Sequence, residues 1–120
     1  MRLERHPNRV VDGELSGLVM FIDRFGNALT NIKHEALKKA FPGAAESGLV
    51  VVLGNRRIRG IARSYGDAPI GTLIAIVGSS GRLEVAQVGG HAALRFGFGE
   101  GDRVAVRAES GSGRASRSES

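Results

Sequence analysis

Short apolar runs of strand length, separated by Gly-rich turns, dominate the pattern along the chain. The runs are rich in Val, Ile and Leu, which is typical of strands joined by tight turns. We predict strands over residues 14–22, 28–32, 48–53, 56–63, 72–77, 82–87 and 103–107. With 18 glycines in all, this succession predicts a mainly all-β fold, either a small sandwich or a closed or nearly closed antiparallel β-barrel.

One segment has helical spacing instead. Apolar residues recur three and four positions apart within residues 33–41, so we predict a helix there, with Asn31 as its cap and Pro42-Gly43 at its end. A second short helical turn is expected near residues 91–94. The Gly54-Asn55 pair between two strand-like runs predicts a hairpin. The fold is therefore expected to be a barrel with one or two short helices.

Length and composition indicate a single domain with loose ends. At 120 residues and 12.6 kDa the chain can bury one core but not two. We expect a linker or N-terminal extension over residues 1–12, the barrel over residues 13–108, and a disordered tail over residues 109–120, which is rich in Ser, Gly, Arg and Glu. No apolar leader or membrane-length run is present, so we expect a cytoplasmic location and no membrane partner.

The absence of cysteine and the scattered histidines limit the possible chemistry. No disulfide framework can form, and His6, His34 and His91 lack the spacing of metal ligands. No Gly-x-Ser-x-Gly elbow, His-Glu-x-x-His motif or P-loop occurs. The sequence therefore predicts neither a metal site nor a complete catalytic set.

The net charge of +5 has a local origin. Arg56, Arg57, Arg59 and Arg63 occur together with no acid between them. A solvated strand face explains such a run, and a nucleic-acid-binding strand is the functional alternative. Aromatic residues make up only 5% of the chain, which argues against a platform for stacking bases.

The loop at residues 23–27 has an unusual density of recognition groups. It follows a strand-like run and combines the Asp23 carboxylate, the Phe25 ring and the Asn27 amide. An amide can both donate and accept, which suits the edge of a purine, and an aromatic ring offers a stacking face. The structural alternative is an Asx-stabilised turn in which Gly26 adopts positive φ and Asn27 bonds its own backbone.

A second candidate lies at residues 78–81, where two serines sit between two glycines. Such a turn can act as an anion-binding nest of backbone amides, or it can be an ordinary hairpin turn. Glu84 follows on the next strand, and its alternation with Leu83 and Val85 predicts that it faces away from them, as a solvated residue or a ligand acceptor. Asp23 and Glu84 could also meet across a barrel mouth as an acid/base pair.

Three stretches resemble, in the same order, the C-terminal domain of the S-adenosyl-L-methionine (SAM) hydroxide adenosyltransferase family, a family of SAM hydrolases related to the fluorinases and chlorinases. They are IDRFGNALTNI at residues 22–32, SYGDAPIG at residues 64–71 and GSSGRLEVA at residues 78–86. The resemblance extends over roughly residues 12–106. Three motifs in the same order are more specific than any one of them alone.

The resemblance implies a β-barrel that accompanies a larger N-terminal α/β domain in chains that assemble as homotrimers. SAM would lie between the α/β domain of one subunit and the barrel of its neighbour, and no cofactor is implied. The groups that activate water would belong to the α/β domain. The implied partners are SAM or adenosine, and that α/β domain in cis or in trans.

The resemblance also implies roles for individual residues. Asp23 and Ser79 would contact the methionine part or its surroundings, Asn27 the adenine edge, and Phe25 and Tyr65 would form apolar walls. Glu84 and residues 87–89 would complete the pocket. The expected substrate-binding residues are Asp23, Phe25, Asn27, Tyr65, Ser79, Ser80, Glu84 and Gln87.

The function that follows from the resemblance is the binding half of a SAM hydrolase, which converts SAM and water to adenosine and L-methionine. Ser80 and the short spacing between Asp23 and Asn27 favour the water-using branch over the halogenating one. We expect the chain alone to be catalytically inactive. Two alternatives remain, a small basic barrel that binds nucleic acid and a trimerisation module without a ligand.

Overall fold

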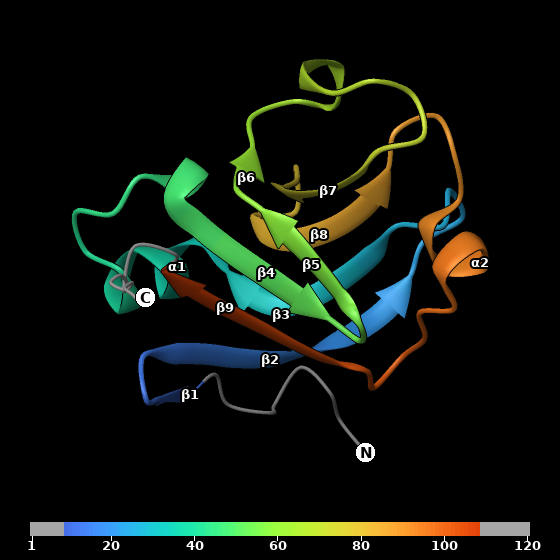
Figure 1. Ribbon diagram of the computed structural model, residues 1–120. Coiled ribbons are helices and arrows are strands. Elements are labelled where there is room, and N and C mark those ends of the chain that lie inside the picture. Colours follow the sequence, from blue (N-terminus) through green and yellow to red (C-terminus); the bar gives the residue numbers. More distant parts are fainter. Residues whose placement is uncertain (1–8, 109–120) are drawn as a thin grey trace.

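The computed structural model describes residues 9–108, which form one curled, nearly closed sheet with two short α-helices outside it (Figure 1). The strands are β1 (Arg9–Val11), β2 (Glu14–Ile22), β3 (Ala28–Lys33), β4 (Leu49–Leu53), β5 (Arg56–Arg59), β6 (Ile61–Ala62), β7 (Leu73–Val77), β8 (Arg82–Gln87) and β9 (Arg103–Ala108). The helices are α1 (His34–Ala40) and α2 (Ala92–Phe96), with 3₁₀ turns η2 (Glu46–Gly48) and η3 (Tyr65–Asp67). The predicted fold class is confirmed.

The strand order is β5-β4-β9-β2-β3-β8-β7-β6, and β1 adds to β2. All pairs are antiparallel except β6 with β7, which is parallel, so the prediction of an antiparallel barrel holds for all but one pair. The two ends of this order, β5 and β6, are consecutive in the chain. The sheet thus curls until its two edge strands approach each other, which limits exposed edges.

β2 is the strand that joins the two halves of the curled sheet. Its first half, up to Leu18, pairs with β9, and from Val19 onward it pairs with β3. A register shift between Val19 and Phe21 marks the change of partner, and such irregularities bend a strand. At Gly17 an added Cβ would overlap the side chains of Asn31 and Ile32, so glycine allows the close approach of β2 and β3.

The predicted cap of the first helix is wrong. The helix is found at His34–Ala40 inside the predicted range 33–41, but its N-cap residue is Lys33, without a side-chain cap hydrogen bond. Asn31 is instead a buried residue of β3, and its Oδ1 accepts a hydrogen bond from the backbone N–H of Leu18 at 2.9 Å. Strand pairing with β2 carries Asn31 into the core before the helix begins.

The predicted hairpins are confirmed, with one break. β4 and β5 pair around Gly54-Asn55, and β7 and β8 pair around the turn at residues 78–81. The predicted strand 56–63 ends at Arg59, because Gly60 has φ +82° and turns the chain into β6. The Gly60 N–H still donates to the carbonyl oxygen of Leu49 at 2.7 Å, so the turn remains tied to β4.

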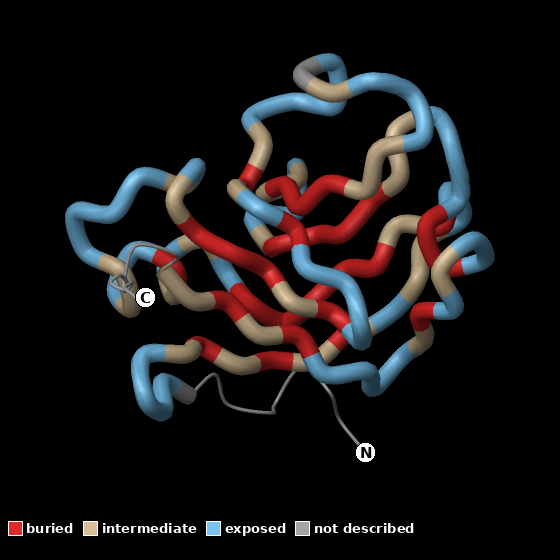
Figure 2. The backbone as a smooth tube through the Cα atoms, in the orientation of Figure 1, coloured by how far each residue is buried: buried red, intermediate tan, exposed pale blue. Residues whose placement is uncertain are grey.

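Two apolar clusters cover the two faces of β8. The main core lies inside the curled sheet and includes Leu83 and Val85, and Figure 2 shows its buried residues concentrated in the strands. A smaller cluster of Ile74, Ile76 and Ala86 lies on the other face of β7 and β8. Ala62, Ala68 and Val88 pack against this second cluster. β8 is therefore buried on both faces.

Some predictions concern parts of the chain that the structure does not describe. The tail at residues 109–120 and most of the predicted N-terminal extension lie outside the described residues, while residues 9–11 form β1 against β2. Between residues 9 and 108, no helix has the length and apolar character needed to cross a membrane.

Candidate functional site

The Asp23 carboxylate organises the loop between β2 and β3. Its Oδ1 accepts hydrogen bonds from the backbone N–H groups of Phe25 at 2.9 Å and Asn27 at 3.0 Å. Its Oδ2 accepts a hydrogen bond from Nδ2 of Asn27 at 3.3 Å. Gly26 has φ +85°. The Asx-type turn is thus present with Asp23, rather than Asn27, bonding the backbone, and it holds the loop in one shape.

The start of α2 braces this loop from one side. The backbone N–H of Ala93 donates to the carbonyl oxygen of Gly26 at 2.9 Å, and a Cβ at Gly26 would overlap the His91 ring. His91 Nδ1 accepts a hydrogen bond from the backbone N–H of Leu94 at 3.0 Å, so this ring also caps α2. Sequence reasoning missed His91 as part of the site, although its position just before a short helix was a signal for a cap.

Glu84 is the buried carboxyl group of the site. It lies on the face of β8 that points away from the main core, in register with Leu29 of β3 and Ile76 of β7. Only 7% of the residue is exposed, so the interpretation as a solvated residue is wrong. The sequence pattern identified the face correctly but could not show that the segment between β6 and β7 packs over it.

Three neighbours accommodate the Glu84 carboxyl group. Ser80 Oγ donates a hydrogen bond to Oε2 at 3.2 Å, and the Tyr65 side chain of η3 also hydrogen-bonds to Glu84. At Gly78 an added Cβ would overlap this carboxyl group. The turn at residues 78–81 is therefore shaped around Glu84, and glycine at its first position makes the room.

Electrostatics connect Glu84 with Tyr65 and Asp23. Burial raises the pKa of Glu84 above its usual value, and the charge of Asp23 raises it further, while the hydrogen bonds from Ser80 and Tyr65 act in the opposite direction. Partial burial also raises the pKa of the Tyr65 hydroxyl, with further contributions from the charges of Glu84 and Asp23. Asp23, Tyr65 and Glu84 therefore belong to one cluster, and we call these residues, with Asn27 and Ser80, the carboxylate cluster.

The remaining predicted site residues lie around this cluster with different degrees of contact. The Phe25 side chain is 62% exposed, and the Arg24 guanidinium lies 4.9 Å from the centroid of its ring. Gln87 Nε2 donates to the carbonyl oxygen of Gly71 at 3.1 Å, so Gln87 holds the segment before β7 against β8. Ser79 is exposed at the tip of the turn, and the structure does not bring it together with the cluster.

The turn at residues 78–81 has the hydrogen bonds of a hairpin. The Gly81 N–H donates to the Gly78 carbonyl oxygen at 2.9 Å, and the Gly78 N–H donates to the Arg82 carbonyl oxygen at 3.1 Å. Ser80 Oγ accepts from the Arg82 N–H at 3.2 Å while it donates to Glu84. Both glycine amides are thus used inside the hairpin, which favours the ordinary turn over the anion-binding nest.

The cluster suits a cationic ligand with a hydrogen-bonding edge. Two carboxyl groups interact here in a protein of positive net charge, next to a phenol and a primary amide. No group of three or more His, Asp or Glu side chains with metal-binding geometry occurs among the described residues. Within residues 9–108 the cluster thus offers carboxyl, phenol and amide groups for hydrogen bonding and charge interaction, without a metal-binding set.

The brace between the loop and α2 can be tested with two glycine substitutions. Gly26→Ala and Gly13→Ala both place alanine at positive φ, +85° and +79°, which costs about 1–2 kcal/mol at each position. Only at Gly26 does the new methyl group overlap the His91 ring, because the space around Gly13 is open. We expect Gly26→Ala to lower the free energy of unfolding by about 1–3 kcal/mol more than Gly13→Ala. Urea denaturation measures both variants, and equal losses of the free energy of unfolding would contradict a brace between Gly26 and His91.

The burial of Glu84 predicts a pH-dependent stability. The pKa of Glu84 is higher in the folded chain than in the unfolded one. The contribution of Glu84 to the free energy of unfolding is therefore complete below its unfolded pKa and is lost as the pH rises through its folded pKa. Glu84→Gln removes this loss, so its free energy of unfolding relative to the wild type should increase as the pH rises above about 4. The exposed Glu35→Gln is the control. If the difference in free energy of unfolding between Glu84→Gln and the wild type stayed constant with pH, this would count against a buried, ionisable Glu84.

Comparisons with known proteins agree with the fold and extend the resemblance. Residues 17–105 match the family model of the SAM hydroxide adenosyltransferase C-terminal domain. The chain is 36% identical over 99 residues to (R)-S-adenosyl-L-methionine hydrolase of Thermus thermophilus. The aligned region covers 82% of this chain and 34% of that protein. The chain thus spans about a third of the length of this curated relative.

Two solved structures share the fold. An uncharacterized conserved protein from Thermotoga maritima superposes with a TM-score of 0.72 at 27% identity, over 85% of this chain and 39% of that one. A conserved hypothetical protein from Thermus thermophilus superposes with a TM-score of 0.62 at 35% identity, over 88% of this chain and 39% of that one. The match over residues 17–105 and the similarity to the hydrolase have the same implication: the chain belongs to the SAM hydroxide adenosyltransferase C-terminal domain family.

Proposed function

We propose that this chain is the substrate-binding domain of a SAM hydrolase and that the carboxylate cluster, together with Phe25, forms its part of the SAM site. The observation that carries the proposal is the convergence of Asp23, Tyr65 and Glu84, linked by charge and hydrogen bonding. These residues come from the three sequence stretches that resemble the family. The similarity to a SAM hydrolase supports the same ligand.

The geometry supports a division of roles. The Asn27 amide keeps an acceptor oxygen beyond its bond to Asp23 and would bind the adenine edge. Phe25 and Tyr65, which are 62% and 42% exposed, would form the walls beside the adenosyl group. Asp23 and Glu84 would attract the positive sulfonium and ammonium groups of SAM, with Ser79, Ser80 and Gln87 at the border of the proposed SAM site.

The charge balance of the reaction determines what these carboxyl groups contribute. The oxygen of water bonds to the ribose carbon as the carbon–sulfur bond breaks, the electron pair of that bond stays on sulfur in methionine, and a proton of the water is released. The positive charge on sulfur therefore disappears along the reaction. A carboxylate near sulfur stabilises the substrate more than the transition state, so it contributes to binding rather than to rate.

It follows that the rate acceleration comes from elsewhere in the assembled enzyme. A water held in line with the carbon–sulfur bond, in a site closed to solvent, gains mainly from positioning. We place the groups that hold this water on the family's N-terminal α/β domain, in cis or in trans. The exposed side chains of Phe25, Tyr65, Ile70 and Leu94 would be covered by that domain, and a homotrimer would supply it from a neighbouring subunit.

The proposal predicts a specific loss of binding in an asparagine variant. Asn27→Ala should weaken the binding of SAM about tenfold, or about 1.4 kcal/mol, because it removes one amide that bonds adenine. Asn55→Ala, in the exposed turn between β4 and β5, should leave the affinity unchanged. Isothermal titration calorimetry of both variants measures the difference. Unaltered SAM binding by Asn27→Ala would instead favour an assembly module without a ligand.

The same samples test whether the chain has catalytic activity of its own. We expect no release of adenosine when the chain alone is incubated with SAM, as followed by chromatography. Rapid release of adenosine would contradict the assignment of the water-activating groups to another domain. Binding without turnover agrees with the proposal.

A further inference from the structure

The outer face of three neighbouring strands carries arginines and no acids. β4 lies between β5 and β9, and none of these strands contains Asp or Glu. In register, Arg59 of β5 and Arg107 of β9 flank Val50, and Arg57 and Ala105 flank Val52. Because residues in register lie on the same face of a sheet, the arginines of β5 and β9 share one face.

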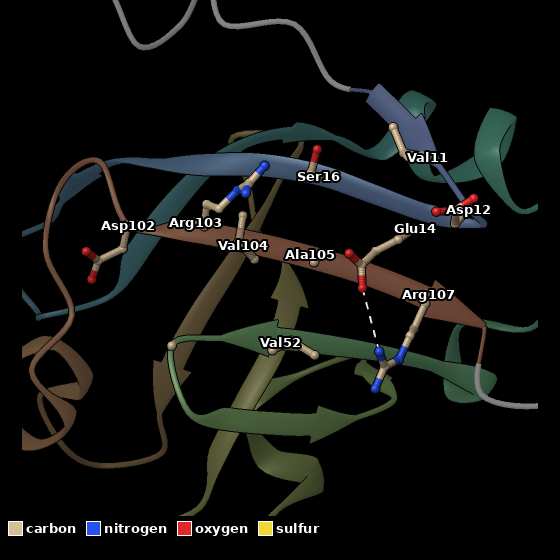
Figure 3. A pocket seen from close by; sticks show the side chains of 11 residues that line it. Val11, Asp12, Glu14, Ser16, Val52, Asp102, Arg103, Val104, Ala105 and Arg107 are labelled. Atoms are coloured by element: carbon tan, nitrogen blue, oxygen red, sulfur yellow. Dashed lines mark ion pairs between the residues drawn. The ribbon is translucent and has the colours of Figure 1, made fainter.

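This face is hollowed next to β9. A groove of about 760 Å³ extends across β2, β9 and β4, and its lining includes the small side chains of Ser16, Ala105 and Val52. Figure 3 shows Arg103 and Arg107 on β9 with Ala105 between them. We call this groove, with Arg57 and Arg59 at its β5 side, the arginine groove.

Three acids, Asp12, Glu14 and Asp102, line the groove itself beside Arg103 and Arg107. With Arg57 and Arg59 of β5 included, the arginines exceed these acids by one charge. Glu14 Oε2 lies 3.6 Å from Arg107 NH1, as Figure 3 shows. Asp102 Oδ2 accepts a hydrogen bond from the Gly99 N–H at 2.8 Å, and Asp12 lies in the turn between β1 and β2. Arg57 and Arg103 are exposed, and neither is in an ion pair within residues 9–108.

The neighbouring Arg56 has a different environment. Its guanidinium lies 4.7 Å from the centroid of the Phe96 ring, which Arg95 approaches at 5.5 Å. Both arginines thus lie against one aromatic ring at the end of α2. Within the described part of the chain, no aromatic side chain lines the groove itself.

We propose that the arginine groove binds the phosphate backbone of a nucleic-acid duplex without reading its bases. The planar guanidinium fork matches phosphate oxygens, and exposed arginines without ion pairs are available to release counterions from a polyanion. A groove lined without aromatic side chains does not suit the stacking of single strands. The groove is lined by none of the residues of the carboxylate cluster, which lie in the loop after β2, in η3, in the turn at residues 78–81 and on β8. The proposal is therefore independent of the proposed SAM site.

A charge-matched pair of double variants tests the groove. The test variant is Arg57→Gln with Arg103→Gln, and the control is Lys38→Gln with Lys39→Gln on the exposed side of α1. Both remove two positive charges from the full chain. Fluorescence anisotropy with a short labelled DNA duplex of mixed sequence gives the affinity at several salt concentrations, and circular dichroism shows whether each variant is folded.

We expect the wild type and the lysine control to bind the duplex at about 50 mM salt with the same salt dependence. The arginine variant should bind more weakly, and the slope of log K against log salt should be smaller in magnitude by about 1.8, because two phosphate contacts are lost. Arg57→Lys with Arg103→Lys keeps the charges and should keep most of the slope.

Three results would overturn the proposal. One is no binding by the wild type at about 20 mM salt. Another is an equal loss of affinity for the duplex in the arginine variant and in the lysine control, which would assign the binding to net charge alone. The third is displacement of the duplex by polyglutamate when its carboxylates are at the same concentration as the phosphates of the DNA. This result would assign the groove to an acidic protein partner.

Discussion

The burial of Glu84 is the constraint on which the rest of the site depends. A buried carboxyl group on a central strand is unfavourable unless neighbours hydrogen-bond it, and here Ser80 and Tyr65 do so from two different turns. Gly78 makes room for the same group. The turn before β8 and the 3₁₀ turn after β6 are therefore both arranged around one side chain, and Asp23 lies close enough to change its pKa.

The parts of the fold that were predictable from the sequence depend on local patterns. An apolar run bounded by turn residues identifies β4. Alternation around Glu84 identifies the two faces of β8, since side chains of a strand alternate between its faces. The loop at residues 23–27 stood out because several recognition groups are adjacent in the sequence. A meeting of Asp23 and Glu84 was one option that the barrel fold offered, and the resemblance to the family added Tyr65 and the grouping of all three in one site.

The parts that were not predictable depend on contacts between distant residues. Asn31 was expected to cap α1, but pairing with β2 places its amide beside the backbone of Leu18. Glu84 was expected to be a solvated residue or a ligand acceptor, because the covering of the second face of β8 by residues 62 and 68 depends on how β6 returns to β7. The brace between Gly26 and His91 joins residues that are 65 positions apart in the chain. Local alternation of apolar and polar residues does not indicate a contact over that distance.

The most direct test of the account is a nuclear magnetic resonance titration of the ¹⁵N-labelled chain with SAM. If the carboxylate cluster binds the adenosyl group, the largest shifts will appear at the amides of residues 23–27, at Tyr65 and in residues 78–88, and the amides of β5 will not change. Saturable shifts confined to β4, β5 and β9, or no shifts at millimolar SAM, would contradict the central claim.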